Sequence, residues 1–295
     1  MLDLSIIIVN WNVKDLLLAA LKSIYKYTKG LSFEVFVSDN GSTDGSQEMV
    51  KAQFPQVKLI DNGSNLGYPR ANNEGIKRAA GRYVILLNPD TEVTEGSLAS
   101  LIRFMDTHPE AGAVGPKLEY PDGSFQPSCR SFPTIETEFY RAFFLDQIFP
   151  KSKIFGKYMM SHWKHNDIRE VDQPMGAALM VRKAVIDEVG MMDEGLVFWF
   201  DEVDWCKRIK NAGWKIFFTP QAKIYHHKNK SFVQWKALKA SFKLAKIWRG
   251  SRNYYYRKHH GVLSVVIVNL LDILQIIFIL AVLYSVGEFI LRAFS

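Results

Sequence analysis

Cysteine is scarce in this sequence: Cys129 and Cys206 are the only two among 295 residues, and neither belongs to a CxxC motif or a Cys/His cluster. This scarcity excludes a disulfide framework, argues against a structural zinc site and favours a reducing compartment. With 19 glycines, 11 prolines and no fixed repeat, the chain also differs from collagen-like, solenoid and disordered proteins. Hydrophobic residues make up 48% of it, so we expect a globular fold with a full core.

Acidic residues are almost absent from the C-terminal part. Residues 205–295 contain 16 Lys or Arg but two Asp or Glu, whereas residues 1–204 contain 21 and 28. A basic region that runs into an apolar segment favours an anionic membrane surface over nucleic acid as the partner. The start, MLDLSIIIVNWN, lacks the basic residues and long apolar run of a signal peptide. We therefore expect the cytoplasmic face of the cell membrane.

Two helices are predicted in this C-terminal part. In residues 231–249 one face is apolar and its neighbour is basic, which predicts an amphipathic helix that lies on a membrane; the apolar positions are Phe232, Trp235, Leu238, Phe242, Ala245 and Trp248, and the basic ones are Lys236, Lys239, Lys243, Lys246 and Arg249. Residues 262–290 are long enough to span a bilayer, which takes about 20 residues, but Asn269, Asp272 and Gln275 share one face. Three interpretations stay open: an interfacial or re-entrant helix, a span whose polar face is buried in an oligomer, or a soluble dimerisation helix.

Two nucleotide-binding fingerprints are missing: no GxGxxG follows the first apolar run, and no GxxxxGK[ST] occurs. Instead, short apolar runs alternate with helical patterns, which predicts a mostly parallel α/β sheet buried on both faces. The predicted strands are 4–9, 33–37, 57–60 and 83–87, and the helices include 16–24, 70–80 and 97–107. Further along we expect loops and one helix over 120–174, a strand at 176–183, a helix at 201–213, and two short strands, WKIFFTP and AKIYHH.

Polar residues follow each of the four N-terminal strands: Asn10 and Asn12, Asp39 and Asn40, Asp61 and Asn62, and Asn88 and Asp90. Open α/β sheets bind ligands outside the carboxyl ends of their strands, so these side chains are candidates for a nucleotide or sugar site. Asn and Asp also favour turns. We favour the turn interpretation for Asn40 and Asn62, which precede glycines, and function for Asp39 and Asp90.

Three further places in the sequence have side chains that could bind a metal or transfer a proton. Asp90, just past a buried strand, could hold Mg²⁺ or Mn²⁺ shared with a diphosphate. Asp201, Glu202 and Asp204 stand among aromatic residues, which suits a general base of raised pKa, although a helix dipole also favours acids in a first turn. His226, at the end of a predicted strand, could ligate a metal or bind phosphate, or could be a packing residue.

Together these pieces resemble the family 2 glycosyltransferases with a GT-A fold, a Rossmann-like mixed sheet flanked by helices, and in particular the bacterial rhamnosyltransferase-like branch. The resemblance covers about residues 1–231. It rests on SIIIVNWN (5–12), VSDNGSTDGS (37–46), NLGYPRANNEGI (65–76), GRYVILLNPDTEV (81–93), GAVGPKLEYPDGSFQPSCRSFPT (112–134), MGAALMVRK (175–183), FDEVDWCKRIKNAGWKIFFTP (200–220) and HHKNKS (226–231). It implies a GT-A domain over 1–230, with a nucleotide-sugar half (1–120) and an acceptor half (121–230), followed by a tail over 231–295.

The resemblance also implies roles for single residues. Asn10, Trp11 and Asp39 would line the nucleoside pocket. Gly67 would let the backbone approach the donor, whose phosphates or sugar would face Arg70 and Asn73. Asn88 and Asp90 stand in the DXD-type motif, with Asp90 as the metal ligand. His226 would complete the metal or diphosphate site.

The catalytic pair departs from the branch, which usually has Glu-Asp where this chain has Asp201-Glu202. The second position generally supplies the base, so the resemblance assigns that role to Glu202 and leaves Asp201 or Asp204 as alternatives. It implies an inverting, metal-dependent transfer from a nucleotide-diphosphate sugar, best dTDP-rhamnose, to a lipid-linked or saccharide acceptor in cell-surface polysaccharide synthesis. A homo-oligomer through the tail is possible.

Two other functions stay open from the residues. A sugar nucleotidyltransferase would need a Gly-rich loop with Arg or Lys after its first strand, where VNWNVKD offers only Lys14. A non-catalytic nucleotide-sugar-binding membrane scaffold would keep Asp39 and the basic tail but lack the base.

Overall fold

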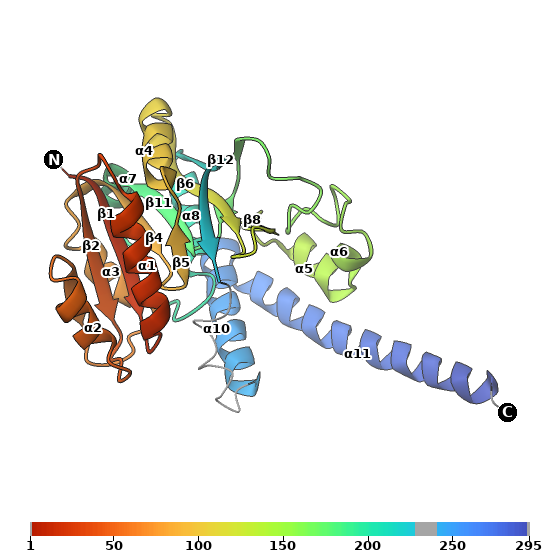
Figure 1. The fold of residues 1–295 in the computed structure, drawn as a ribbon. Helices are drawn as coiled ribbons and strands as arrows, with labels where there is room; N and C mark the ends of the chain where they lie inside the picture. The colour runs from red at the N-terminus through yellow and green to blue at the C-terminus, as the bar shows by residue number, and fades with distance from the viewer. Residues whose placement is uncertain (1, 228–240, 294–295) are drawn as a thin grey trace. The chain divides into compact units, whose positions relative to one another are not determined.

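Apolar runs in the N-terminal part form the strands of a central sheet, as predicted (Figure 1). The computed structural model describes residues 2–227 and 241–293. Two compact units are present: unit 1 comprises the chain up to Arg130 with residues 165–252, and unit 2 comprises residues 131–164 with the chain from Asn253 onward.

Four parallel strands make the first half of the sheet in unit 1. Their order is β3-β2-β1-β4, and the helices between them complete the predicted alternation. The strands are β1 (Leu2–Asn10), β2 (Phe33–Asp39), β3 (Lys58–Asp61) and β4 (Gly81–Leu87); the helices are α1 (Lys14–Tyr27), α2 (Ser46–Gln53), α3 (Tyr68–Ile76) and α4 (Ser97–Thr107). The strand order reverses between β1 and β4, which is where open sheets of this kind bind ligands.

The second half of the sheet is mixed rather than parallel. β11 (Ala178–Arg182) runs antiparallel between β4 and β6 (Ala111–Glu119), and β12 (Lys215–His226) runs parallel to β6 and antiparallel to β5 (Thr91–Val93). The short strands are β7 (Phe125–Gln126) and β9 (Arg169–Glu170) on this sheet, and β8 (Cys129–Arg130) and β10 (Gln173–Pro174) in a separate pair; α7 (Lys183–Val189) and α8 (Asp201–Asn211) complete unit 1. Both cysteines are free and buried.

Two of these strands differ from the prediction. β6 was missed because Gly112 and Gly115 interrupt its apolar pattern; a Cβ at Gly115 would lie 2.3 Å from Pro174 and one at Gly112 would lie 2.8 Å from Trp214, so close packing requires glycine at both. The two short strands predicted between residues 214 and 227 are one strand, β12, whose register shifts between Thr219 and Lys223. The shift explains why the sequence pattern is broken there.

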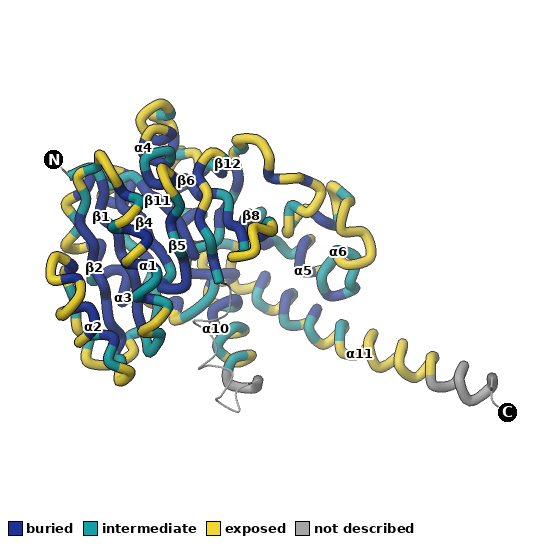
Figure 2. Tube along the Cα trace, viewed as in Figure 1, coloured by how far each residue is buried: buried dark blue, intermediate teal, exposed yellow. Residues whose placement is uncertain are grey.

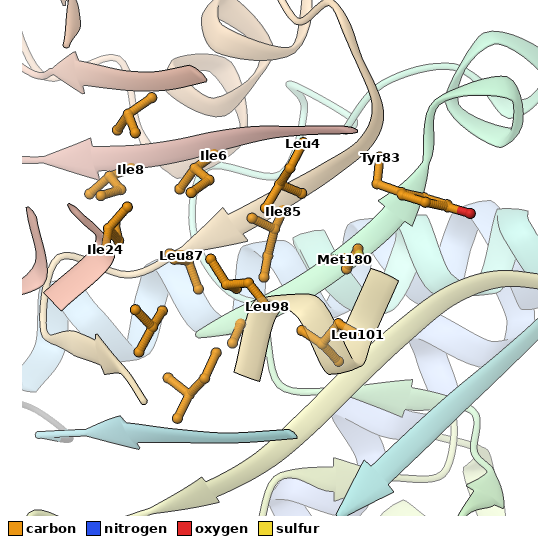
Figure 3. Close-up of a cluster of buried hydrophobic side chains, with 14 of the residues drawn as sticks. Leu4, Ile6, Ile8, Ile24, Tyr83, Ile85, Leu87, Leu98, Leu101 and Met180 are labelled. Atoms are coloured by element: carbon orange, nitrogen blue, oxygen red, sulfur yellow. The ribbon is translucent and has the colours of Figure 1, made fainter. Parts of the chain in front are cut away.

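The core packs α1 and α4 on one face of the sheet. Leu4, Ile6 and Ile8 of β1 and Ile85 and Leu87 of β4 are fully or almost fully buried with the apolar side chains of these helices, as Figure 3 shows for Ile24, Leu98 and Leu101. Each such side chain contributes about 1.5–3 kcal/mol to folding. The polar residues that follow these strands are therefore carried on a rigid scaffold.

Unit 2 contains two short helices and the long C-terminal one. α5 (Ile135–Ala142) begins at a capping box made by Thr134 and Thr137, continues to α6 (Leu145–Ile148), and packs against α11 (Val262–Ala293). The single helix expected over 120–174 is thus two helices. Within unit 2 the hydroxyl of the buried Tyr256 donates to Glu138, at 3.4 Å.

The predicted C-terminal helices are present where the structure describes them. α10 (Ser241–His260) contains the end of the predicted amphipathic helix and continues past it, while the predicted positions up to residue 240 lie outside the described residues. α11 confirms the predicted apolar helix. Its residues Val262–Val286 are long and apolar enough to cross a membrane, and most of their side chains are exposed (Figure 2).

Candidate active site

Asn10 and Asp39 meet at the carboxyl ends of β1 and β2. The strands pair so that the two residues lie side by side, and Asn10 Nδ2 donates to Asp39 Oδ2 at 2.7 Å. The other carboxylate oxygen of Asp39 accepts from the backbone N–H of Ser42 at 2.7 Å and from Gln47 Nε2 at 2.9 Å. Both Asn10 and Asp39 are inaccessible to solvent, and Trp11 follows them half-buried. The structure therefore brings the predicted nucleoside-binding residues together, with the acidic one held rigidly.

Asn40 and Asn62 hold the loops behind this pair. Asn62 Nδ2 donates to Asn40 Oδ1 at 3.0 Å and to Ser38 Oγ at 2.9 Å, and Gly41 and Gly63, which follow the two asparagines, both have positive φ. These contacts agree with the turn interpretation of the sequence.

The N-terminus of α3 meets the loop that precedes α8. Gly67 has a φ of 82°, and a Cβ there would lie 3.0 Å from the carbonyl oxygen of Val197, so the position requires glycine. Asn73 Nδ2 donates to the carbonyl oxygen of Met192 at 2.9 Å, and its Oδ1 accepts from the N–H of the same residue at 3.1 Å. Asn73 therefore holds this loop in place. Arg70 is exposed, 3.7 Å from Glu194.

Asp90, in the turn before β5, and His226, the last residue of β12, are brought together by the pairing of these two strands. His226 lies opposite Thr91 in the β5–β12 ladder, so its Nε2 stands 3.3 Å from Asp90 Oδ1. The other ring nitrogen, Nδ1, lies 2.6 Å from Gln126 Oε1. Gln126 Nε2 is directed at the carbonyl oxygen of His226, so its Oε1 is left to accept a proton from Nδ1. Nε2 is thus the ring nitrogen that faces the Asp90 carboxylate.

Asn88 lies at the start of the same turn. Its backbone N–H donates to the carbonyl oxygen of Ala177, and its own carbonyl oxygen accepts from the N–H and hydroxyl of Thr91. The backbone of Asn88 thus fixes the turn that carries Asp90.

Asp201 and Glu202 open α8 from a strained backbone. Trp199 and Phe200 both have a φ of 63°, a left-handed conformation that non-glycine residues rarely adopt and that clusters at functional sites. Asp201 is 4% exposed. Burial raises the pKa of the Asp201 carboxyl well above its ordinary value, and the charge of Glu202 and a hydrogen bond between the two carboxyl groups raise it further.

Glu202 is the more readily ionised of the two. Burial raises its pKa as well, but its hydrogen bonds with Asp201 and with the backbone N–H of Gly176, and the positive charge of Arg130, oppose that increase. Asp201 therefore retains the shared proton, and Glu202 carries the negative charge. A carboxylate of raised pKa is a stronger base than an ordinary one, which suits it to accept a proton from a hydroxyl.

Tyr68 faces both acidic groups from the N-terminus of α3. Its hydroxyl donates to the carbonyl oxygen of Gly176 at 3.0 Å, and burial together with the negative charges of Asp201, Glu202 and Asp90 raises its pKa. All three carboxylates therefore lie near enough to this one hydroxyl for their charges to act on its pKa.

Asp204 has a structural partner. It is fully buried and its Oδ2 lies 2.9 Å from Arg208 Nε, whose other nitrogens donate to the carbonyl oxygens of Val189 and Met191. This ion pair ties α8 to the loop after α7, which sets Asp204 apart from the other two acids of its cluster.

Comparison with known proteins places this arrangement in a family. Residues 5–165 match the sequence profile of glycosyl transferase family 2. The chain belongs to that family. An N-acetylglucosaminyl-diphospho-decaprenol L-rhamnosyltransferase of Mycobacterium tuberculosis is 33% identical over 205 residues, which cover 66% of this chain and 66% of the relative.

Two solved structures share the fold of this family 2 chain. Staphylococcus aureus TarS (residues 1–349) superposes with a TM-score of 0.52 at 16% identity, over 88% of this chain and 72% of TarS. GalNAc-T7, crystallised with UDP, GalNAc and Mn²⁺, superposes with a TM-score of 0.58 at 17% identity, over 87% of this chain and 50% of its own. These similarities confirm the predicted GT-A fold.

The family 2 site fits a divalent cation at Asp90 and His226. The Asp90 carboxylate and Nε2 of His226 lie 3.3 Å apart, and carboxylate oxygens and imidazole nitrogens are both metal ligands in proteins. Among the described residues, no group of three or more His, Cys, Asp and Glu side chains gathers for a metal. Mg²⁺ is commonly held by one or two carboxylates together with substrate phosphates, so a sparse protein ligand set agrees with such a site.

Sequence reasoning missed four residues of this site: Tyr68, Gln126, Arg130 and Gly176. All four lie inside motifs that were recognised, NLGYPRANNEGI, GAVGPKLEYPDGSFQPSCRSFPT and MGAALMVRK, so their neighbourhood could be found from the sequence. Their roles depend on contacts between distant segments, which no spacing along the chain predicts.

Proposed function

We propose that this protein is an inverting glycosyltransferase that moves a sugar from a nucleotide-diphosphate donor to a lipid-linked saccharide acceptor. The observation that carries the proposal is that Asp201, Glu202 and Asp90 all lie close enough to Tyr68 for their negative charges to raise the pKa of its hydroxyl. A base and a cation-binding carboxylate near one another are what transfer from a diphosphate requires.

The two acids Asp201 and Glu202 have different roles in the proposed proton transfer. The Glu202 carboxylate accepts the proton of an acceptor hydroxyl as that oxygen bonds to the anomeric carbon, and the bond from that carbon to the diphosphate oxygen breaks with its electron pair on the diphosphate. Asp201, as the protonated partner, orients Glu202 through their hydrogen bond. Attack on the face opposite the diphosphate inverts the anomeric configuration.

Donor binding is assigned to the other side of the site. Asn10, Trp11 and Asp39 bind the nucleoside, with Asp39 as the acceptor for its base, and Gly67, Arg70, Asn73 and Asn88 border the diphosphate and sugar. Asp90 and His226 would hold Mg²⁺ or Mn²⁺, which when bound neutralises charge that develops on the leaving diphosphate. The rigid hydrogen bonding of Asp39 supports its assignment.

The substrates are proposed from the relatives. The 33% identical Mycobacterium protein is named for rhamnosyl transfer to N-acetylglucosaminyl-diphospho-decaprenol, so we propose dTDP-rhamnose as the donor and a polyprenyl-diphosphate saccharide as the acceptor. The apolar α11 and the basic residues before it would place the enzyme at the cytoplasmic membrane surface, where such an acceptor resides.

The test is transfer itself. The purified full chain is incubated with a panel of nucleotide sugars and a polyprenyl-diphosphate-linked N-acetylglucosamine, with and without Mn²⁺, and the lipid product is resolved by mass spectrometry. We expect one donor to be used, with activity lost in Glu202→Gln. Donor binding without any transfer would favour a non-catalytic scaffold. Glu48→Gln, an exposed glutamate of α2, is the matched control.

A further inference from the structure

We propose that α11 lies in the plane of an anionic membrane surface, with one face on unit 2 and the other in lipid, and that it does not cross the bilayer. The proposal rests on the membrane association proposed above and concerns its geometry. It is argued from contacts inside unit 2 alone.

One face of α11 is covered by protein. Ser264, Val268 and Leu271 are buried, Gln275 is half-buried, and Phe278 contacts Phe143 with ring centroids 5.5 Å apart. These positions follow one another at spacings of three and four, so they form a single stripe. Protein therefore covers α11 along this stripe from residue 264 to residue 275, and still contacts it at Phe278, which is 39% exposed.

The opposite face is apolar and uncovered. Leu263, Val266, Leu270, Ile273 and Ile277 are exposed by 51–71% of their surfaces. In the sequence, Asp272 and Gln275 are polar residues that argue against a simple membrane span. Unlike the exposed apolar residues, both are half-buried and lie on or beside the covered stripe. In residues 262–275 each side of the helix thus suits a different environment, protein on one and lipid on the other. From residue 276 to residue 286 the side chains are exposed all round the helix, and nearly all are apolar.

The extent of the covered stripe conflicts with a transmembrane orientation. A helix rises 1.5 Å per residue, so Phe278 lies about 24 Å along the axis from Val262. If α11 stood upright in a bilayer whose hydrocarbon core is about 30 Å thick, the α5–α6 segment that touches Phe278 would be immersed in it. Residues 279–293, about 22 Å long, are too short to span the core by themselves.

The α5–α6 segment carries charges that suit water and not hydrocarbon. In α5 the side chains of Arg141 and Glu136 are exposed by 40% and 50%, and Lys157, beyond α6, pairs with Glu136 at 3.6 Å. Charged groups of this kind are rare in the bilayer core. With α11 lying flat, the segment stays on the aqueous side and the apolar face meets the lipid.

A cluster of aromatic rings fixes the segment to α11. Phe278 contacts Phe143, Phe143 contacts Phe139 at 4.9 Å, and Phe139 is 44% exposed beside the helix. Aromatic rings favour the boundary between headgroups and acyl chains. The basic residues Arg257 and Lys258 in the last turn of α10 directly precede α11, which suits an anionic leaflet.

The experiment measures depth along the lipid-facing side. Leu263→Cys, Leu270→Cys and Ile277→Cys are made separately in the full chain, labelled with a fluorophore and bound to vesicles containing anionic lipid. Each vesicle preparation contains lipid brominated at a known depth. The native cysteines are buried, so the introduced one is labelled. The three positions are seven residues apart and share one face, so a flat helix gives the same quenching depth at all three.

An upright or re-entrant helix gives a different result. Each step of seven residues along an upright helix would change the depth of the fluorophore in the bilayer by about 10 Å. A depth that changes in this way from position to position would overturn the proposal. Lys29→Cys, at an exposed position just after α1, is the control that stays unquenched. If the protein does not float with vesicles, the proposal also fails, whereas transfer to a water-soluble acceptor would still report on the proposed catalytic function separately.

Discussion

Tyr68 donates a hydrogen bond to the carbonyl oxygen of Gly176, 108 residues further along the chain, at 3.0 Å. The N–H of Gly176 in turn interacts with the carboxylate of Glu202. One glycine therefore joins the N-terminus of α3 to the proposed base. A Cβ at Gly176 would lie 3.4 Å from Cβ of Glu202, so the base packs directly over this backbone.

Tyr68→Phe is expected to lower both stability and turnover. The substitution leaves the carbonyl oxygen of Gly176 without this donor, which costs about 1 kcal/mol of folding free energy, and it loosens the backbone that orients Glu202. We expect a severalfold loss of kcat with KM for the donor little changed. Tyr140→Phe, which removes an exposed hydroxyl that donates to Glu136, is the control and should change neither.

Glu202→Gln should abolish transfer and spare donor binding, because the base acts on the acceptor. General-base catalysis contributes about 10²–10⁴-fold, so kcat should fall by at least 100-fold. Isothermal titration with the nucleotide sugar would show an unchanged Kd. If Asp201→Asn is inactive and Glu202→Gln keeps its turnover, the roles of the two acids are reversed.

The acid pair also predicts how activity and stability depend on pH. Because burial raises the pKa of both carboxyls, the acid limb of kcat/KM should lie above the ordinary carboxylate range. The folded chain then holds a proton that the unfolded chain releases, so the pair lowers the free energy of unfolding as pH rises above the unfolded pKa, about 4.

Asp201→Asn should therefore raise the Tm at pH 7–8. Each unit by which the pKa is raised corresponds to about 1.4 kcal/mol, which shifts the Tm of a domain of 150–250 residues by a few degrees. The difference should vanish below about pH 4, where both carboxyls are protonated in either state. Differential scanning calorimetry between about pH 4 and pH 8 measures this difference in Tm. A variant that is less stable than the parent at pH 8 would contradict the raised pKa of Asp201.

Asp90→Asn should remove most of the Mn²⁺ dependence of donor binding, because an amide is a weaker ligand for a hard cation than a carboxylate.

Gln126→Met should weaken the same proposed metal site indirectly. It removes the acceptor that fixes His226, and loss of such a supporting contact typically costs 10–100-fold in metal affinity. Mn²⁺ titration followed by electron paramagnetic resonance, with the nucleotide present, measures both; equal affinity in parent and Asp90→Asn would refute the site.

The sequence predicted those parts of the fold that local patterns specify. The four parallel strands, α4 and the apolar helix follow from periodicity, and Asn10 and Asp39 could be placed together because both end neighbouring strands. The sequence did not predict β6, because its glycines allow close packing against Trp214 and Pro174, which are far away in sequence.

For the site, the sequence predicted which residues belong together but not the contacts that hold them. Asp90 and His226 were assigned to one metal site by resemblance, but the contact of His226 with Gln126 depends on a register between β7, β6 and β12 that no local pattern encodes. For Asn73, the resemblance suggested a contact to the donor, whereas its amide holds the loop at Met192. Whether it also touches a donor stays a prediction.

The pairing of β5 with β12 has a consequence for how the protein is made. Asp90 and His226 are separated by 136 positions, so a ribosome that has released the first 130 residues has already exposed β1 to β4 and the Asn10–Asp39 pair. The other half of the site waits for β12, a pairing of high contact order that forms slowly. Nascent chains of this protein would thus acquire the proposed nucleoside pocket well before they acquire the proposed cation site, so incomplete chains would lack activity during synthesis.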